Sequence, residues 1–261
     1  MRGRPNSWSG VGEAYAASYA ELCAGTGATL RELLGAGDGR TLLDVGAGTG
    51  DLAVTFAADG WIVDAREPEE SMREIARQRH PDVRITDGAL PELPDADRTF
   101  DAVVANFVLN HVPDPRAAAA ELCRVTRDAA AATIWIRSPS WLWAEVCERA
   151  GLQAAAGGRL PEDKDFERTT DGFARMLGDA GWPVPDMVEK QWIWNAPATA
   201  LWASVEGGVA GAGAYYLGLD AREQARFRRA FEGLITERAQ DDVLALEHVA
   251  GIAVMRRDPF L

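Results

Sequence analysis

The sequence is poor in cysteine and histidine, with three of each among its 261 residues. The cysteines, Cys23, Cys123 and Cys147, are widely spaced and form no C-x-x-C pair. This pattern argues against a disulfide framework or a zinc site and favours small buried thiols in a reducing compartment. No group of histidines and acids has the spacing of metal ligands, so no metal site is expected.

The chain also lacks a long apolar run and an excess of basic charge. No uninterrupted segment approaches the roughly 20 apolar residues of a membrane span, and the opening MRGRPNSWSGVGEAY has no apolar core like that of a signal peptide. A formal net charge of -13 argues against a nucleic-acid partner. We therefore expect a cytoplasmic protein, a monomer or homodimer, with no membrane or nucleic-acid partner and a single domain over residues 1–261.

The first half of the chain alternates short apolar runs with helical patterns, which is typical of βαβ units. Strands are expected at 41–46, 61–66, 82–86, 101–105 and 131–137. Helices are expected near 50–58, 69–79 and 114–127, and two more precede the first strand, joined through the glycines of AGTGA. The pattern predicts an α/β domain with a parallel sheet.

The second half is less regular. It predicts a helix over 171–182 and two strands, MVEKQWIW at 187–194 and VLALEHVAGIAVMRR at 243–257. The two strands are too far apart in sequence for a hairpin turn. The inserts at 138–167 and 196–240 are therefore expected to form a helical cap, with residues that contact the substrate.

The stretch TLLDVGAGTGDLA, residues 41–53, has the strongest chemical signal. Its glycines, Gly46, Gly48 and Gly50, follow G-x-G-x-G, and Asp51 stands where a dinucleotide-binding fingerprint has its last glycine. Asp44 precedes the loop, where its carboxylate would repel a pyrophosphate but attract an ammonium group. The loop thus predicts an adenosine cofactor that carries a positive charge and no phosphate, and disfavours NAD.

These residues resemble the first motif, D-x-G-x-G-x-G, of class I S-adenosylmethionine-dependent methyltransferases. EPEESM resembles the family's D-x-S-x-x-M, with Glu67 in place of the usual aspartate and with Pro68 and Met72 in register. Asp64 is a competing candidate, but it lies inside the expected strand. The resemblance implies a doubly wound, mostly parallel seven-stranded sheet with the last strand antiparallel, and N-terminal helices within 1–40 that cover the cofactor.

Later motifs extend the resemblance. TDGALPELP is similar to G-D-A-x-x-L-P-F, with Gly88 where alanine is usual, and FDAVVANFVLNHVPDP is similar to the ubiquinone-biosynthesis-like branch. In the turn before strand five, Ala129 and Ala130 replace the family's glycine pair. The resemblance implies these cofactor-binding residues: Tyr19, Asp44, Gly46, Ala47, Gly48, Gly50, Glu67, Pro68, Met72, Asp87, Gly88, Ala89, Asn106, Phe107 and His111.

The resemblance implies methyl transfer from S-adenosylmethionine to an oxygen, nitrogen or carbon nucleophile of a small molecule, a secondary metabolite. A non-methylating enzyme that uses the same cofactor site, such as a cyclase, and a regulatory binding module remain alternatives. His111 is the candidate catalytic base, or it organises its loop. The cap tryptophans either line a substrate pocket or pack the cap against the domain: Trp141, Trp143, Trp192, Trp194 and Trp202.

Overall fold

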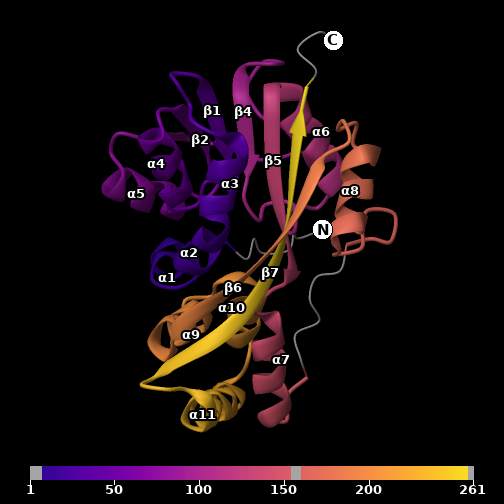
Figure 1. The fold of residues 1–261 in the computed structure, drawn as a ribbon. Helices are drawn as coiled ribbons and strands as arrows, with labels where there is room; N and C mark the ends of the chain where they lie inside the picture. The colour runs from indigo at the N-terminus through magenta and orange to yellow at the C-terminus, as the bar shows by residue number, and fades with distance from the viewer. Residues whose placement is uncertain (1–7, 154–159, 258–261) are drawn as a thin grey trace.

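A seven-stranded sheet runs through the molecule in the computed structural model, which describes residues 8–153 and 160–257. Its order is β3-β2-β1-β4-β5-β7-β6, and β7 alone runs in the direction opposite to the other six strands (Figure 1). The predicted seven-stranded, mostly parallel sheet with an antiparallel last strand is confirmed. The strands are β1 (Thr41–Val45), β2 (Ile62–Arg66), β3 (Arg84–Thr86), β4 (Phe100–Ala105), β5 (Thr126–Arg137), β6 (Asp186–Pro197) and β7 (Val243–Arg256).

Helices cover both faces of this sheet, as a doubly wound fold requires. Helices α3 (Gly27–Leu34), α4 (Asp51–Ala58) and α5 (Glu70–Arg79) pack on one face, and α6 (Pro115–Val125) and α8 (Thr170–Asp179) pack on the other. The central strands are apolar on both sides because each side is buried: Leu42 packs toward α3 and Leu43 toward α6.

Strands β6 and β7 are 12 and 14 residues long, and their paired ends extend past the other strands toward the cap helices (Figure 1). Around their far end lie α7 (Ser140–Arg149), α9 (Ala198–Glu206), α10 (Ala210–Leu217) and α11 (Ala221–Arg238). We call these four helices the cap. They share an aromatic-rich core with α1 (Gly12–Ala16) and α2 (Tyr19–Cys23), and the helices fall within the segments 138–167 and 196–240 singled out from sequence.

The AGTGA segment joins two helices as predicted, and it does so as 3₁₀ helix η1 (Ala24–Thr26) between α2 and the start of α3. The first of the two predicted helices is divided into α1 and α2. A side chain at Gly25 would lie 2.3 Å from Trp192 Nε1, so close packing explains this glycine. Ala129 and Ala130 do not form a turn: they pair with Ala102 and Val103 inside β5, which begins where α6 ends. Small side chains suit a central strand whose two faces are both covered.

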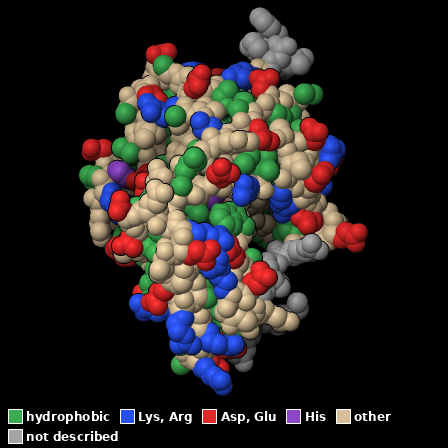
Figure 2. Space-filling model, turned by 60° about the horizontal axis from the view of Figure 1, so that its bottom comes forward, with side chains coloured by type: hydrophobic (Ala, Val, Ile, Leu, Met, Phe, Trp, Pro, Cys, Tyr) green, Lys and Arg blue, Asp and Glu red, His purple; other side chains and the backbone are tan. Residues whose placement is uncertain are grey.

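Acidic and basic side chains are interspersed over the cap surface (Figure 2). The arginines of α7 and α11 pair with acids of the same two helices: Arg149 contacts Glu237 at 2.7 Å, and Arg238 contacts Glu145 at 2.7 Å. Such exposed pairs add little stability singly but tie α11 to α7 at several points. In the part of the chain that the structure describes, no helix has both the length and the apolar character needed to cross a membrane.

Candidate functional site

A cavity of about 640 Å³ lies between the cap and the carboxyl ends of β1, β2, β4 and β5. Eleven of the fifteen residues predicted to bind the cofactor line it: Tyr19, Gly46, Gly48, Glu67, Pro68, Met72, Gly88, Ala89, Asn106, Phe107 and His111. Asp44 and Ala47 line an adjoining pocket of about 220 Å³, which shares Gly46 and Asn106 with the larger cavity. In a parallel α/β sheet, ligands bind outside these strand ends.

The glycine loop between β1 and α4 has three positions where the backbone conformation favours glycine. Gly46, Gly48 and Gly50 have φ angles of 70°, 55° and 80°, which L-residues rarely adopt. A Cβ at Gly46 would also lie 2.5 Å from Val108, and one at Gly50 would lie 3.2 Å from Ala76. Gly50 lines neither pocket: it begins α4 and lets α5 approach.

Asp44 lies at the end of β1, between Ala65 of β2 and Val104 of β4. Its side chain is only 1% exposed, and its Oδ2 has no hydrogen-bond partner among the described residues. Burial, together with the negative charge of Glu67, raises the pKa of this carboxyl to about 7. A buried acceptor without a donor is costly, so this position is suited to a ligand that brings a cationic donor.

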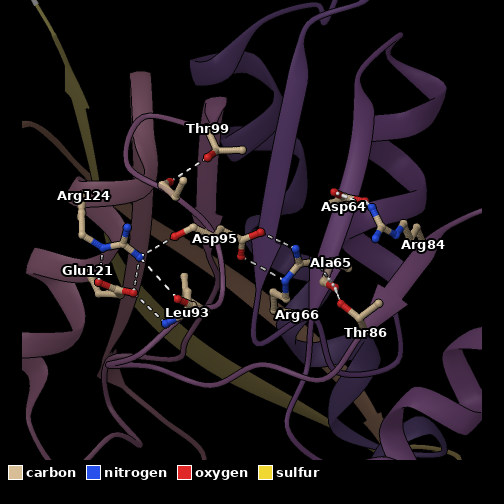
Figure 3. Close-up of polar contacts among 11 residues, drawn as sticks. Asp64, Ala65, Arg66, Arg84, Thr86, Leu93, Asp95, Thr99, Glu121 and Arg124 are labelled. Atoms are coloured by element: carbon tan, nitrogen blue, oxygen red, sulfur yellow. Dashed lines mark hydrogen bonds and ion pairs between the residues drawn. The ribbon is translucent and has the colours of Figure 1, made fainter.

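Glu67 follows β2 and reaches across to the glycine loop. Its Oε2 accepts from the Gly48 N–H at 2.9 Å, and its Oε1 accepts from the Glu69 N–H at 2.9 Å. Burial raises the pKa of this carboxyl, while these two bonds oppose the shift. The competing candidate, Asp64, points away: it pairs with Arg84 at 3.4 Å and does not line the cavity (Figure 3).

Gly88 and Ala89 line the cavity beyond β3, but Asp87 does not. The Asp87 carboxylate is largely exposed and accepts from Arg73 Nη1 at 3.1 Å. Gly88 is explained by Arg66, because a Cβ at Gly88 would lie 2.8 Å from Arg66 Cδ.

Arg66 cannot easily move away from Gly88. It is 5% exposed and forms a two-bond ion pair with Asp95, at 2.5 and 3.1 Å (Figure 3). The loop that holds Asp95 is fixed in turn by Arg124 of α6, which donates to the Asp95 carbonyl at 2.8 Å. Glycine at position 88, where the family usually has alanine, thus accompanies a buried arginine on the neighbouring strand.

Asn106, at the end of β4, connects the sheet to the N-terminal helices. Its Oδ1 accepts from the hydroxyls of Thr26 at 2.8 Å and Thr133 at 2.7 Å, and its Nδ2 donates to the Cys23 carbonyl at 3.1 Å. Phe107 has a φ of 58°, and its ring stacks on Trp135 with centroids 3.7 Å apart. These contacts give the cavity floor a fixed shape.

His111 lines the cavity from the loop after β4, and its ring meets the edge of Trp8 at 5.0 Å between centroids. The His111 side chain is exposed at the cavity, and the protein atoms packed around it lower the pKa of the imidazole by desolvation, to about 4. His111 is therefore neutral at pH 7 and can accept or donate a hydrogen bond. Tyr19 lines the same cavity, and its hydroxyl accepts from Trp143 Nε1 at 2.8 Å.

Several lining residues were not among the predicted site residues. Tyr15 of α1 lies against Gly48, with its Cε1 3.5 Å from where a Cβ would stand, and Asn110, Trp135, Ser138 and Arg168 also line the cavity. The position of Ser138 directly after strand five was a usable signal, because strand ends of a parallel sheet converge. Of the five tryptophans singled out in the cap, Trp143 alone lines the cavity among the described residues.

Comparison with known proteins places this geometry in a family. A family model described as "Methyltransferase domain" matches residues 43–133. A demethylmenaquinone methyltransferase of Streptomyces avermitilis is 36% identical over 187 residues, which are 69% of this chain and 78% of that protein. The chain belongs to the class I S-adenosylmethionine-dependent methyltransferases. The chain is also 38% identical to a demethylmenaquinone methyltransferase of Renibacterium salmoninarum over 96 residues, which are 37% of this chain and 40% of that protein.

Solved structures share the fold at low identity. A SAM-dependent methyltransferase from Aquifex aeolicus has a TM-score of 0.51 at 14% identity, covering 94% of this chain and 98% of that one. The [4+2]-cyclase SpnF has a TM-score of 0.51 at 22% identity, covering 91% and 78%. The fold of this methyltransferase is therefore shared with an enzyme described by another activity.

The residues present fit S-adenosylmethionine, the cofactor of this family. Asp44 offers the orphaned carboxylate that an ammonium group requires. The three glycines leave room for close backbone approach, and Glu67 presents a buried carboxylate beside them. The larger cavity has Glu67 and Glu69 at this end and no Lys or Arg near them among its described lining, which does not suit a pyrophosphate.

Proposed function

We propose that this methyltransferase transfers a methyl group from S-adenosylmethionine to an oxygen, nitrogen or carbon nucleophile of a small molecule, a secondary metabolite. The observation that carries the proposal is continuity: one cavity extends from the glycine loop to the aromatic side chains of the cap. A cofactor held at Gly46 and Gly48 and a substrate under Trp143 would share that space. A cavity of this size suits a small molecule.

The cofactor-binding roles are part of the proposal. Asp44 pairs with the ammonium group, Glu67 accepts from the ribose hydroxyls, and the backbone of Gly88 and Ala89 meets the adenine ring. When bound, S-adenosylmethionine supplies a methyl group made electrophilic by its sulfonium. Asp87 is the acceptor for the adenine amino group only if its carboxylate turns from Arg73 toward the cavity, a small movement for an exposed side chain.

On the substrate side, the chain's contribution is position and exclusion of water. Trp8, Trp135 and Trp143 contribute apolar walls, and holding two reactants in line can supply roughly 7–11 kcal/mol of the barrier in favourable cases. A pKa of about 4 makes His111 a weak base at pH 7. We therefore assign His111 to orienting the nucleophile through a hydrogen bond, and to proton removal only when that nucleophile is itself acidic.

The names of the relatives suggest one substrate class. The Streptomyces and Renibacterium relatives are described as demethylmenaquinone methyltransferases. An apolar, ring-containing acceptor is compatible with the aromatic walls of this cavity. A cyclase with the same fold is the second candidate, favoured by the structural likeness to SpnF and by the weakness of His111 as a base.

The decisive experiment follows the methyl group. The protein is incubated with S-adenosylmethionine carrying a labelled methyl and with a small-molecule metabolite extract. The proposal expects label in one or a few products, and loss of that label when Glu67→Ala weakens cofactor binding. Cofactor binding without any labelled product would favour the cyclase or a regulatory module, and tighter binding of NAD than of S-adenosylhomocysteine would reject both.

A further inference from the structure

One wall of the cavity carries a basic side chain. Arg168 is the one Lys or Arg side chain among the cavity-lining residues that the structure describes, whereas Glu67 and Glu69 line the cofactor end. Arg168 belongs to the segment before α8, which lies beside the loop that follows β4, whereas Glu67 follows β2, and β1 lies between these two strands. The cavity is therefore polarised, with acids where the cofactor is proposed to lie and a cation beyond it.

The segment that carries Arg168 is fastened beside His111. Lys164 pairs with Asp114 at 2.8 Å, and Arg116 Nη1 donates to the carbonyls of Lys164 at 3.3 Å and Asp165 at 3.5 Å. Asp114 begins α6 only three residues after His111. Arg168 is thus held at the substrate side of the cavity by polar contacts outside it.

The Arg168 guanidinium is fixed in a plane that leaves one edge available. Its Cζ lies 3.7 Å from the ring centroid of Phe166, which packs in turn against Phe173 of α8. Nη1 donates to Asp165 Oδ1 at 2.7 Å and to the Phe166 carbonyl. Nε and Nη2 make no hydrogen bond with any described residue. A stacked guanidinium with two free parallel donors is the geometry that binds a carboxylate through both oxygens.

Among the described residues that line the substrate side, aromatic side chains are prominent and Arg168 is the one basic side chain. Trp8, Trp135, Trp143, Tyr215 and Phe227 line it, and His111 is neutral at pH 7. A phosphate ester, with nearly two negative charges, would be poorly compensated by one arginine in a protein of net charge -13. Arg168 already pairs with Asp165 through Nη1, so its Nε and Nη2 donors suit one further carboxylate, and the apolar walls suit the ring that carries it.

Resting on the proposed function, we infer that the acceptor is an aromatic carboxylic acid whose carboxylate is held by Arg168, with its ring between the cap aromatics. Arg168 is then a specificity-determining residue. It fixes the acid at the wall that carries Arg168, so that the nucleophile on the opposite side of the ring faces the glycine loop. The acids at the cofactor end disfavour the reverse orientation.

The test uses matched probes with the full chain saturated with S-adenosylhomocysteine. The probes are four pairs of an aromatic acid and its neutral amide, including 3-hydroxybenzoate with 3-hydroxybenzamide and indole-3-acetate with indole-3-acetamide. Calorimetry is expected to show that the acids bind at least about tenfold more tightly than their amides. Arg168→Met should abolish that preference without changing amide affinity, and Arg168→Lys should retain part of it.

Arg175→Met is the matched control, since it removes an exposed cation of α8 that pairs with Glu167 and does not line the cavity. Equal binding of acids and amides, binding of no acid, or an acid preference that survives in Arg168→Met would each overturn the inference. S-adenosylhomocysteine binding is measured on the same samples. Absence of an acid preference in the unsubstituted protein, with normal S-adenosylhomocysteine binding, rejects the Arg168 inference alone, whereas failure of that protein to bind S-adenosylhomocysteine rejects the proposed function.

Discussion

The cofactor half, residues 41–133, and the cap are built by different physical means. In the cofactor half, backbone conformation decides the structure: glycines with positive φ shape the loop, and acids stand directly after strands. In the cap, side-chain packing decides it, through rings such as Trp143, Phe227 and Phe231 that come from distant parts of the chain. In our proposal, the first region determines which cofactor binds, and the second determines which substrate shares the cavity with it.

This difference predicts that substitutions in the cofactor half change the affinity for the cofactor, whereas substitutions in the cap change mainly the stability of the fold. The largest effect is expected at Asp44. Asp44→Asn keeps the shape but removes the charge, so the ammonium of S-adenosylmethionine loses its buried partner. We expect the Kd for S-adenosylmethionine to rise about 100-fold, in line with loss of one partner of a buried ion pair. Calorimetry measures this, and an unchanged Kd would remove Asp44 from the site.

The same carboxyl predicts a pH dependence. Its pKa in the free protein is raised from 3.8 to about 7, so the folded state holds its proton more tightly than the unfolded chain does. Its contribution to stability is therefore fully present below about pH 4 and is lost as the pH rises through about 7. Cofactor binding needs the ionised form, so affinity should rise from pH 6 to pH 8. In Asp44→Asn, the free energy of unfolding and the affinity for S-adenosylmethionine should both depend less on pH.

Glu67 is expected to give the next largest effect. Glu67→Ala removes the carboxylate proposed to accept from the ribose hydroxyls, and it also frees the Gly48 N–H that the carboxylate now holds. The Kd for S-adenosylmethionine should rise by well over tenfold, about 1.4 kcal/mol or more. Asp64→Ala is the matched control on the same strand, because Asp64 pairs with Arg84 outside the cavity. Equal losses in the two variants would reject the assignment of Glu67.

The contrast between local backbone conformation and long-range packing also explains which parts of the structure could be predicted from the sequence. The glycine loop and Asp44 are signals of local geometry, since a positive φ or an acid at a strand end depends on a few neighbouring residues. The seven-stranded, mostly parallel sheet and its antiparallel last strand followed from the family resemblance that these local motifs carry. In the cofactor half, local motifs were therefore sufficient to predict most of the structure.

The remainder depends on contacts between distant residues. Glycine at position 25 is required by Trp192, and the stack of Phe107 on Trp135 joins two strands. Arg168 reaches the cavity only because Lys164 and Arg116 fasten its segment beside α6. No spacing in a single sequence reports such pairings, so the cap aromatics could be placed near a pocket but not divided into lining and packing residues.

Gly88→Ala tests whether the cofactor half depends on close packing as well as on its motifs. The new Cβ would lie 2.8 Å from Arg66 Cδ, and Arg66 is held by Asp95. We expect a loss of about 1–3 kcal/mol in the free energy of unfolding, as for other overpacked sites, measured by denaturant titration. Removing Arg66 should relieve the clash, so Gly88→Ala should cost less in an Arg66→Ala background. Equal costs in both backgrounds would show that Arg66 is not the obstacle.

The smallest change in the free energy of unfolding is expected for a substitution in the cap, and it is an increase in stability. Gly233 lies inside α11, is exposed, and has open space where a Cβ would stand. Gly233→Ala should raise the free energy of unfolding by about 0.5–1 kcal/mol, because alanine loses less backbone freedom on entering a helix. Gly35 also has open space, but its φ of 74° makes alanine strained. Gly35→Ala should destabilise by about 1–3 kcal/mol. A shift of the same sign in both variants would mean that space, and not backbone conformation, governs the effect of alanine at these two glycines.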